Sequence, residues 1–119
     1  MGSLILIVED EPELSRLLSN IVQRQGYRVI EALSGRAALD VLERESPDCI
    51  LLDLAMPGVT GLEVLRVLRG SPQHRHTRIV VVTARPQMVP EAELYGVDRV
   101  MIKPVGVHEL IAAVEEMLG

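Results

Sequence analysis

Five polar side chains in the sequence are of types that together can carry out phosphoryl chemistry. Glu9 and Asp10 are adjacent carboxylates, Asp53 is a third carboxylate, Thr83 supplies a hydroxyl group and Lys103 supplies an amine. Three neighbouring carboxylates repel one another unless a cation joins them. Hard oxygen ligands without a nearby His or Cys suit Mg²⁺, which keeps several waters and pairs with phosphate. A carboxylate nucleophile, a divalent cation, an amine and a hydroxyl group can together stabilise the charge of phosphoryl transfer.

Each of these side chains lies at the end of a short apolar segment that predicts a β-strand. The segments are rich in β-branched residues and are bounded by polar residues. The predicted strands are Leu4–Val8, Arg28–Ala32, Asp48–Asp53, Arg78–Thr83 and Arg99–Ile102. Because most of them read as solid apolar runs and not as alternating ones, we expect burial on both faces, which is typical of parallel sheets covered by helices.

Helical periodicity follows most of the predicted strands. Apolar residues recur at three- and four-residue steps in four segments: Leu14, Leu17, Leu18, Ile21 and Val22; Ala38, Leu39 and Leu42; Leu62, Leu65 and Leu68; and Leu110, Ala113, Val114 and Leu118. Pro12 suits the first turn of a helix, and Ser34 is a predicted N-cap. The fourth helix should have about two turns at most, because Pro86 and Pro90 interrupt its segment.

This alternation predicts an α/β fold: a doubly wound, flavodoxin-like (βα)5 sandwich with a parallel five-stranded sheet in the order 2-1-3-4-5. We expect residues 1–119 to form one domain, since a chain of 119 residues fits one core. In such sheets the functional site lies beyond the carboxyl ends of the strands, at the switch point between strands 1 and 3. The fold therefore predicts that the five polar side chains meet on one rim.

The composition argues against some classes of function. Only Tyr27 and Tyr95 are aromatic, so platforms for stacking bases are lacking, and we expect no direct nucleic-acid binding by this domain. The net charge is −5, and four of the 17 acidic residues lie between Glu9 and Glu13, which leaves the rest of the chain near neutral. The longest early apolar run, Leu4–Val8, is too short to span a membrane.

Other reactive side chains have structural explanations. Cys49 is the single cysteine, so no internal disulfide can form, which favours a cytoplasmic protein. We expect it to be a small buried residue on the third strand, and we expect Met56 and Met88 to be packing residues. The histidines have no ligand set around them, and three are predicted to lie on the surface: His74, His76 and His108. The segment Arg69–Arg78 is predicted to be a solvated connector.

Four short motifs surround the five polar side chains. They are LILIVEDE at residues 4–11, LLDLAMPG at residues 51–58 with Gly61 beyond it, VTA at residues 82–84, and IKP at residues 102–104. In this order and spacing they resemble the receiver domains of two-component response regulators, over essentially the whole chain. Any one motif is weak, but four in register are specific. That family is itself an example of the 2-1-3-4-5 strand order, so the expected order is not independent of the resemblance.

The resemblance implies a role for each site residue. Asp53 is then the phosphorylated residue, and the donor is a phosphohistidine on a sensor histidine kinase or a histidine phosphotransfer protein. Thr83 and Lys103 would contact phosphoryl oxygens. The ligands of Mg²⁺ would be Glu9, Asp10, Asp53 and the backbone carbonyl of Ala55.

The resemblance also implies a switch and not a turnover enzyme. Such a module assists its own phosphorylation and slow dephosphorylation, and it switches a partner, an output domain or a homodimer. The family often has a cis peptide bond before the proline of the last motif, here Lys103–Pro104. An X-Pro bond makes that plausible, since the cis form is disfavoured by only about 0.5–1 kcal/mol.

Two positions depart from the family pattern. Many members carry an aromatic residue three positions before the lysine, which reorients with the threonine on activation, and here that position is Val100. The segment from Thr83 to Gly96 is also a little shorter than usual. Both positions fall on the surface of the fourth helix, fifth strand and fifth helix, which the family often uses for output. We therefore expect intact phosphorylation chemistry, and the two departures leave the mode of signalling open.

Two alternative functions explain part of the pattern. A Mg²⁺-dependent phosphatase that turns over through an aspartyl phosphate needs a general acid near Asp53 and a cap, but Ala55 cannot act as an acid and 119 residues leave no room for a cap. A receiver fold that signals by partner binding alone is disfavoured because Asp53, Thr83 and Lys103 are all present, although Val100 leaves it some room.

Overall fold

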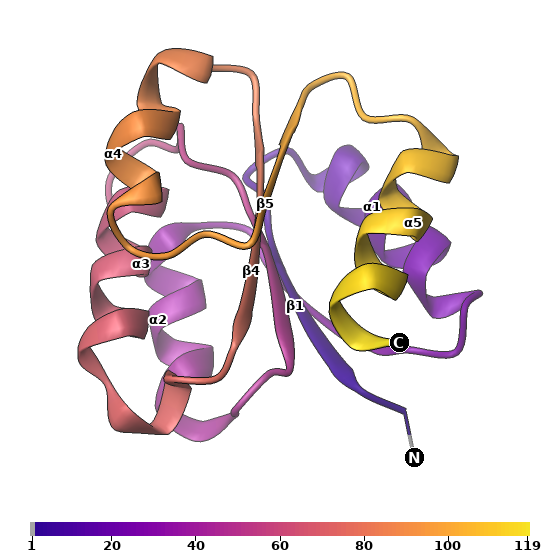
Figure 1. Ribbon diagram of the computed structural model, residues 1–119, viewed down its shortest axis with the longest axis horizontal. Coiled ribbons are helices and arrows are strands. Elements are labelled where there is room, and N and C mark those ends of the chain that lie inside the picture. The colour runs from indigo at the N-terminus through magenta and orange to yellow at the C-terminus, as the bar shows by residue number, and fades with distance from the viewer. Residues whose placement is uncertain (1) are drawn as a thin grey trace.

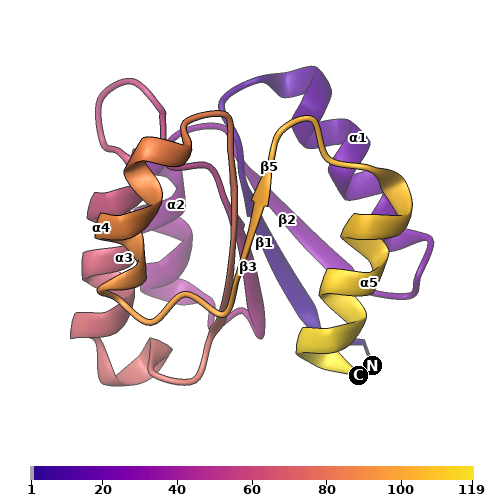
Figure 2. The same ribbon diagram turned by 45° about the horizontal axis from the view of Figure 1, so that its top comes forward.

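The computed structural model describes residues 2–119 and shows a sandwich of three layers, with a β-sheet between two layers of helices (Figure 1). The strands are β1 (Leu4–Val8), β2 (Arg28–Ala32), β3 (Cys49–Leu52), β4 (Arg78–Thr83) and β5 (Arg99–Ile102). The helices are α1 (Pro12–Gln23), α2 (Gly35–Arg44), α3 (Gly61–Gly70), α4 (Val89–Glu93) and α5 (Val107–Leu118), with 3₁₀ turns at η1 (Pro72–His74) and η2 (Pro86–Met88). Helices α1 and α5 cover one face of the sheet, and α2, α3 and α4 cover the other (Figures 1 and 2).

The sheet is parallel throughout and has the strand order β2-β1-β3-β4-β5, which confirms the predicted flavodoxin-like fold. Val8 pairs with Leu52, and Thr83 pairs with Ile102, so the carboxyl ends of the inner strands lie at one edge. The bounds of four strands agree with the prediction. The third is shorter by one residue at each end and places Asp53 just beyond the strand.

The core lies on both faces of the sheet, because successive strand residues point to opposite sides. One cluster packs under α1 and α5 and includes Ile5, Ile7, Leu51, Val80 and Val82. The other packs under α2, α3 and α4 and includes Leu6, Val8, Ile50, Leu52 and Val81. Cys49 on β3 is fully buried, and this burial raises the pKa of its thiol to about 12. The solid apolar runs of the central strands are therefore explained by burial from both sides.

The helices begin and end largely where local sequence signals place them. Pro12 lies in the first turn of α1, and the Ser34 hydroxyl accepts a hydrogen bond of 3.0 Å from the Ala37 amide at the start of α2. Helix α4 has five residues, in agreement with the expected short helix, and Ala92 is its buried residue. No helix within residues 2–119 has both the length and the apolar character needed to cross a membrane.

The prediction that His74 lies on the surface is wrong, whereas His76 and His108 are exposed as expected. The His74 side chain is buried, and its Nε2 atom lies 2.7 Å from the carbonyl oxygen of Leu42. Leu42 belongs to the last turn of α2, where carbonyl groups have no partner within the helix. Because a carbonyl only accepts, Nε2 carries the proton. His74 thus closes the end of α2. The connector before β4 is anchored by the buried side chains of His74 and Thr77, while most of its other residues are exposed, as expected for a solvated segment.

Candidate functional site

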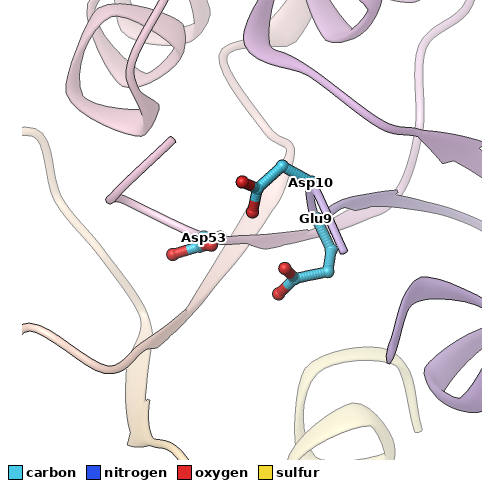
Figure 3. A group of neighbouring side chains, drawn as sticks. All are labelled: Glu9, Asp10 and Asp53. Atoms are coloured by element: carbon cyan, nitrogen blue, oxygen red, sulfur yellow. The ribbon is translucent and has the colours of Figure 1, made fainter. Parts of the chain in front are cut away.

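Four of the five predicted site residues come together at the carboxyl edge of the sheet. Glu9 and Asp10 follow β1, Asp53 follows β3, and one carboxylate oxygen from each lies within 4.8 Å of the other two (Figure 3). Lys103 follows β5, and its Nζ atom lies 2.7 Å from Glu9 Oε1 and 3.4 Å from Asp53 Oδ2. The peptide bond after it, Lys103–Pro104, is cis, as the resemblance implies. The site is thus a group of three carboxylates with one ammonium at its side.

The two innermost carboxylates are nearly inaccessible to solvent. Glu9 is 1% exposed and Asp53 is 4% exposed. Burial raises the pKa of Glu9 above its ordinary value, although Lys103 and the Glu11 amide oppose the shift. Burial likewise raises the pKa of Asp53, against the Ala55 amide and Lys103, which favour the ionised form. The carboxylate charges are therefore only partly compensated by the protein itself.

Two opposing effects act on the pKa of Lys103. Burial lowers the pKa of its amine, but the neighbouring Glu9 and Asp53 carboxylates outweigh burial, so the pKa is raised overall. The amine therefore remains protonated across the neutral range, and it supplies a fixed positive charge between two acidic side chains.

Backbone amides orient three of the site side chains by the same local geometry. Each side chain accepts a hydrogen bond from the amide two residues further on. The bonds run from Glu11 N to Glu9 Oε2 at 3.1 Å, from Ala55 N to Asp53 Oδ1 at 3.1 Å and from Arg85 N to Thr83 Oγ1 at 3.0 Å. The sequence did not predict these donors, because every residue except proline has a backbone amide and the residue type does not show which amide donates. The pattern of Asp or Thr at a strand end is the signal that could have found two of them.

Thr83 lies at the same edge but does not touch the acidic group. Its side chain is fully buried, and its backbone carbonyl accepts a hydrogen bond of 2.9 Å from the amide of Lys103. Within residues 2–119 no side-chain hydrogen bond or ion pair joins Thr83 to Glu9, Asp10 or Asp53. Because its hydroxyl oxygen accepts from Arg85, the hydroxyl hydrogen remains available to donate.

The donor set fits a hard divalent cation such as Mg²⁺. All ligand atoms are oxygens, as Mg²⁺ prefers. Glu9 Oε1 is buried and has the Lys103 ammonium 2.7 Å away, so one positive charge faces three carboxylates. The Ala55 carbonyl oxygen accepts no backbone hydrogen bond from the described part of the chain. A bound cation would offset the carboxylate repulsion that remains.

The loop from Asp53 to Gly61 closes on itself beside the site. The Gly61 amide donates a hydrogen bond of 3.1 Å to the carbonyl of Leu54. A Cβ atom on Gly61 would lie 2.3 Å from the Asp53 carbonyl oxygen, which is far closer than atoms approach, so the start of α3 can seat against Asp53 only with glycine. Gly58 has a φ of 74°, which turns the chain at the tip of the loop. This loop is called the β3–α3 loop below.

The fold and the site together define a receiver domain of the two-component response regulators. The sequence profile of the response regulator receiver domain matches residues 5–115, and the chain belongs to this family. Receiver domains of this family are signalling modules, and no family of turnover enzymes is indicated.

Several known proteins are similar over nearly their full length. Sporulation initiation phosphotransferase F of Bacillus subtilis (strain 168) is 32% identical over 120 residues, which cover 99% of this chain and 95% of that protein. The polar-differentiation response regulator DivK of Brucella ovis is 32% identical over 121 residues, which cover 100% of this chain and 98% of that protein. The crystal structure of the response regulator TrrA of Thermotoga maritima in complex with Mg²⁺-BeF has a TM-score of 0.87 and 30% identity, and the match covers 99% of this chain and 100% of that one.

Proposed function

We propose that this receiver domain takes a phosphoryl group onto Asp53 from a phosphohistidine and thereby switches a partner protein or an output domain. One observation carries the proposal. The Asp53 carboxylate lies at the switch point of the sheet, 3.4 Å from Lys103 Nζ and within 4.8 Å of two further carboxylates. In doubly wound sheets this is the place where ligands bind.

Under this proposal four oxygen ligands hold Mg²⁺: Glu9, Asp10, Asp53 and the backbone carbonyl of Ala55. When bound, the ion neutralises charge on the oxygens of the transferred group. The similar protein TrrA was solved with Mg²⁺ and a beryllofluoride group, which supports this choice of ion.

The residues of the chain position and stabilise the reacting atoms. A carboxylate oxygen of Asp53 attacks phosphorus, so that a P–O bond forms while the P–N bond of the donor breaks, and the electron pair stays on the imidazole nitrogen. Lys103 opposes the effect of burial on the pKa of Asp53, which favours the ionised form that attack requires. The same ammonium then pairs with a phosphoryl oxygen. The Thr83 hydroxyl group donates its hydrogen to a second phosphoryl oxygen, after the Thr83 side chain has moved out of its present position.

The donor is proposed to be a sensor histidine kinase or a histidine phosphotransfer protein. An apolar hollow of about 410 Å³ opens beside Lys103, lined by Leu14, Leu17, Leu18, Val82, Pro104 and Val105. Leu17 on α1 is 53% exposed and adds to the apolar surface of this hollow, and contiguous apolar surface is typical of sites where proteins interact. A donor that brings an imidazole to Asp53 can cover this surface. The proposal places the exchange in the cytoplasm, where a single reduced cysteine persists.

Phosphorylation by a small donor tests the proposal. Incubation with Mg²⁺ and acetyl phosphate is expected to add one phosphoryl group to the wild-type protein, measured by intact-mass spectrometry. Asp53→Asn should add none, because an amide is not a nucleophile toward phosphorus. Asp40→Asn is the matched control: Asp40 pairs with Arg36 on the surface of α2 and should label like the wild type. Equal labelling of the Asp53→Asn protein would contradict the assignment.

A further inference from the structure

We propose that Gly35, at the start of α2, is a positioning residue for the metal site, because its missing side chain makes room for the β3–α3 loop. This inference rests on the proposed function, since it concerns the loop that carries Ala55. It adds to the metal site a residue of α2, whereas the proposed ligands follow β1 and β3, and this residue touches none of these ligands.

Gly35 is in contact with the backbone of that loop. A Cβ atom on Gly35 would lie 2.1 Å from the carbonyl oxygen of Val59 and 2.8 Å from its carbonyl carbon, and also 2.8 Å from Val59 Cγ1. Gly35 is not among the residues with positive φ, so its backbone conformation is open to any amino acid. Space, and not conformation, is therefore the reason for a glycine here.

If a side chain were added, the loop would yield before the helix. Helix α2 is fixed by the buried residues Ala38 and Leu42 and by the Ser34 cap. In the loop, Leu54 and Met56 are buried, whereas Pro57 and Gly58 at its tip are exposed and Val59 is half-buried. The tip has less packing than α2 and moves more easily, so the Val59 backbone would shift away from α2.

A shift at Val59 would reach the metal ligands through the closed loop. The Gly61 amide is bonded to the Leu54 carbonyl at 3.1 Å, which ties the two ends of the loop together, so Val59 and Ala55 lie within one short closed segment. The Ala55 amide donates the bond of 3.1 Å that orients the Asp53 carboxylate. Displacement of the loop therefore changes both the position of the Ala55 carbonyl and the support of Asp53.

The dissociation constant of Mg²⁺, measured from backbone amide shifts well below the melting temperature, tests the inference. Gly35→Ala is expected to raise this constant by about tenfold, the lower end of what loss of an outer-shell support produces. The amide signal of Ala55 should also differ from the wild type before Mg²⁺ is added. Gly70→Ala is the matched control, because no atom lies within 4 Å of a Cβ built on Gly70. It should leave the dissociation constant unchanged.

The outcomes separate this inference from the proposed function. If the wild type itself binds no Mg²⁺ at millimolar concentration, the metal site is wrong. If the wild type binds and Gly35→Ala binds equally well, the positioning role is wrong, even where the variant has a lower melting temperature. Should Gly35→Ala fail to fold in buffer, the same titration is carried out for both proteins in a stabilising osmolyte such as sucrose, which favours the folded state because it is excluded from the protein surface. Weaker Mg²⁺ binding by the refolded variant than by the wild type supports the inference, and equal binding overturns it.

Discussion

Asp10 is the least compensated carboxylate of the site. Glu9 and Asp53 both lie beside the Lys103 ammonium, whereas the Asp10 side chain makes no hydrogen bond or ion pair within residues 2–119. Its charge also helps to raise the pKa of Asp53, after the larger effect of burial. In the absence of a cation, Asp10 therefore contributes mainly repulsion.

Asp10→Asn is expected to stabilise the protein without metal and to weaken its response to Mg²⁺. Removing the repulsion should increase the free energy of unfolding by about 0.5–1 kcal/mol, the size of partly exposed charge interactions. Mg²⁺ binds only the folded site, so it should raise the melting temperature of the wild type by mass action and that of the variant less. Thermal unfolding with and without millimolar Mg²⁺ measures both effects.

Asp40→Asn again serves as the control, with an unchanged response to Mg²⁺. The acidic group is not a metal site if Mg²⁺ leaves the melting temperature of the wild type unchanged and Asp10→Asn leaves the stability of the protein unchanged.

Side-chain types made much of the site predictable from the sequence. Glu9, Asp10, Asp53 and Lys103 are charged residues directly after apolar strands, so pattern and chemistry point to the same rim. The amides that orient them carry no such signal, and neither does the contact of Gly35 with Val59. That contact joins two segments whose approach depends on how α2 and α3 pack.

At the scale of elements, α4 is the most weakly packed helix. It has five residues, and its C-terminal end is held by a side chain from another helix. Arg69 on α3 donates hydrogen bonds to the carbonyl of Tyr95 at 2.8 Å and to that of Gly96 at 3.1 Å. It also donates to the carbonyls of Arg75 and Thr77, both at 3.2 Å, in the segment before β4. One guanidinium group thus fixes the end of α4 to the base of the sheet.

Arg69→Gln is expected to loosen the end of α4 selectively. The loss should be about 2 kcal/mol, because hydrogen bonds to a charged group contribute more than neutral ones. Hydrogen exchange should become faster at the amides of Tyr95 and Gly96, which are bonded within the last turn, before it changes in β1 or β3. Arg44→Gln on α2 is the control, since Arg44 makes one exposed bond to the Asp40 carbonyl. Unchanged exchange at Tyr95 and Gly96 would refute this role for Arg69.

The short α4 also bears on how a signal could leave the site. Val100 is half-buried and packs against the same core cluster as Ala92 of α4. A short, β-branched side chain has restricted rotamers and cannot sweep the area of an aromatic ring. The prolines predicted the shortness of α4 because they act locally, but the fastening by Arg69 depends on tertiary contacts and has no local signal.

For the whole molecule, the alternation of strands and helices predicted a parallel, doubly wound α/β fold, and the strand order was not independent of the resemblance to the receiver family. Parallel strands buried on both faces need helices on both sides, and right-handed crossovers leave few ways to arrange five such units. The buried position of His74 in the connector before β4 was not predictable in this way. This burial depends on His74 meeting Leu42, which is 32 residues distant in the sequence. Local polarity gave the wrong answer there because the end of α2 needed a hydrogen-bond donor.

Because Cys49 is buried in the sheet, the rate at which its thiol reacts reports on opening of the sheet. Cys49 is the single cysteine of the chain, it lies on β3 between β1 and β4, and it is fully buried. The thiolate, and not the thiol, attacks a disulfide reagent, and a pKa of about 12 leaves almost no thiolate in the folded protein at pH 8. Unfolding returns this pKa toward its ordinary value of 9, so stability should fall as the pH rises through that range.

The rate at which a disulfide reagent labels Cys49 at pH 8 should therefore measure how often the central sheet opens. We expect negligible labelling over minutes in native buffer and rapid labelling in strong denaturant. Mg²⁺ should slow the labelling of the wild type, and Asp10→Asn should slow it in the absence of the ion. Fast labelling of the native protein would show that the middle of the sheet opens locally. Because the chain has one cysteine, the absorbance of the released reagent would report on Cys49 alone. It would give the frequency at which the central strands of a ligand-free receiver domain separate.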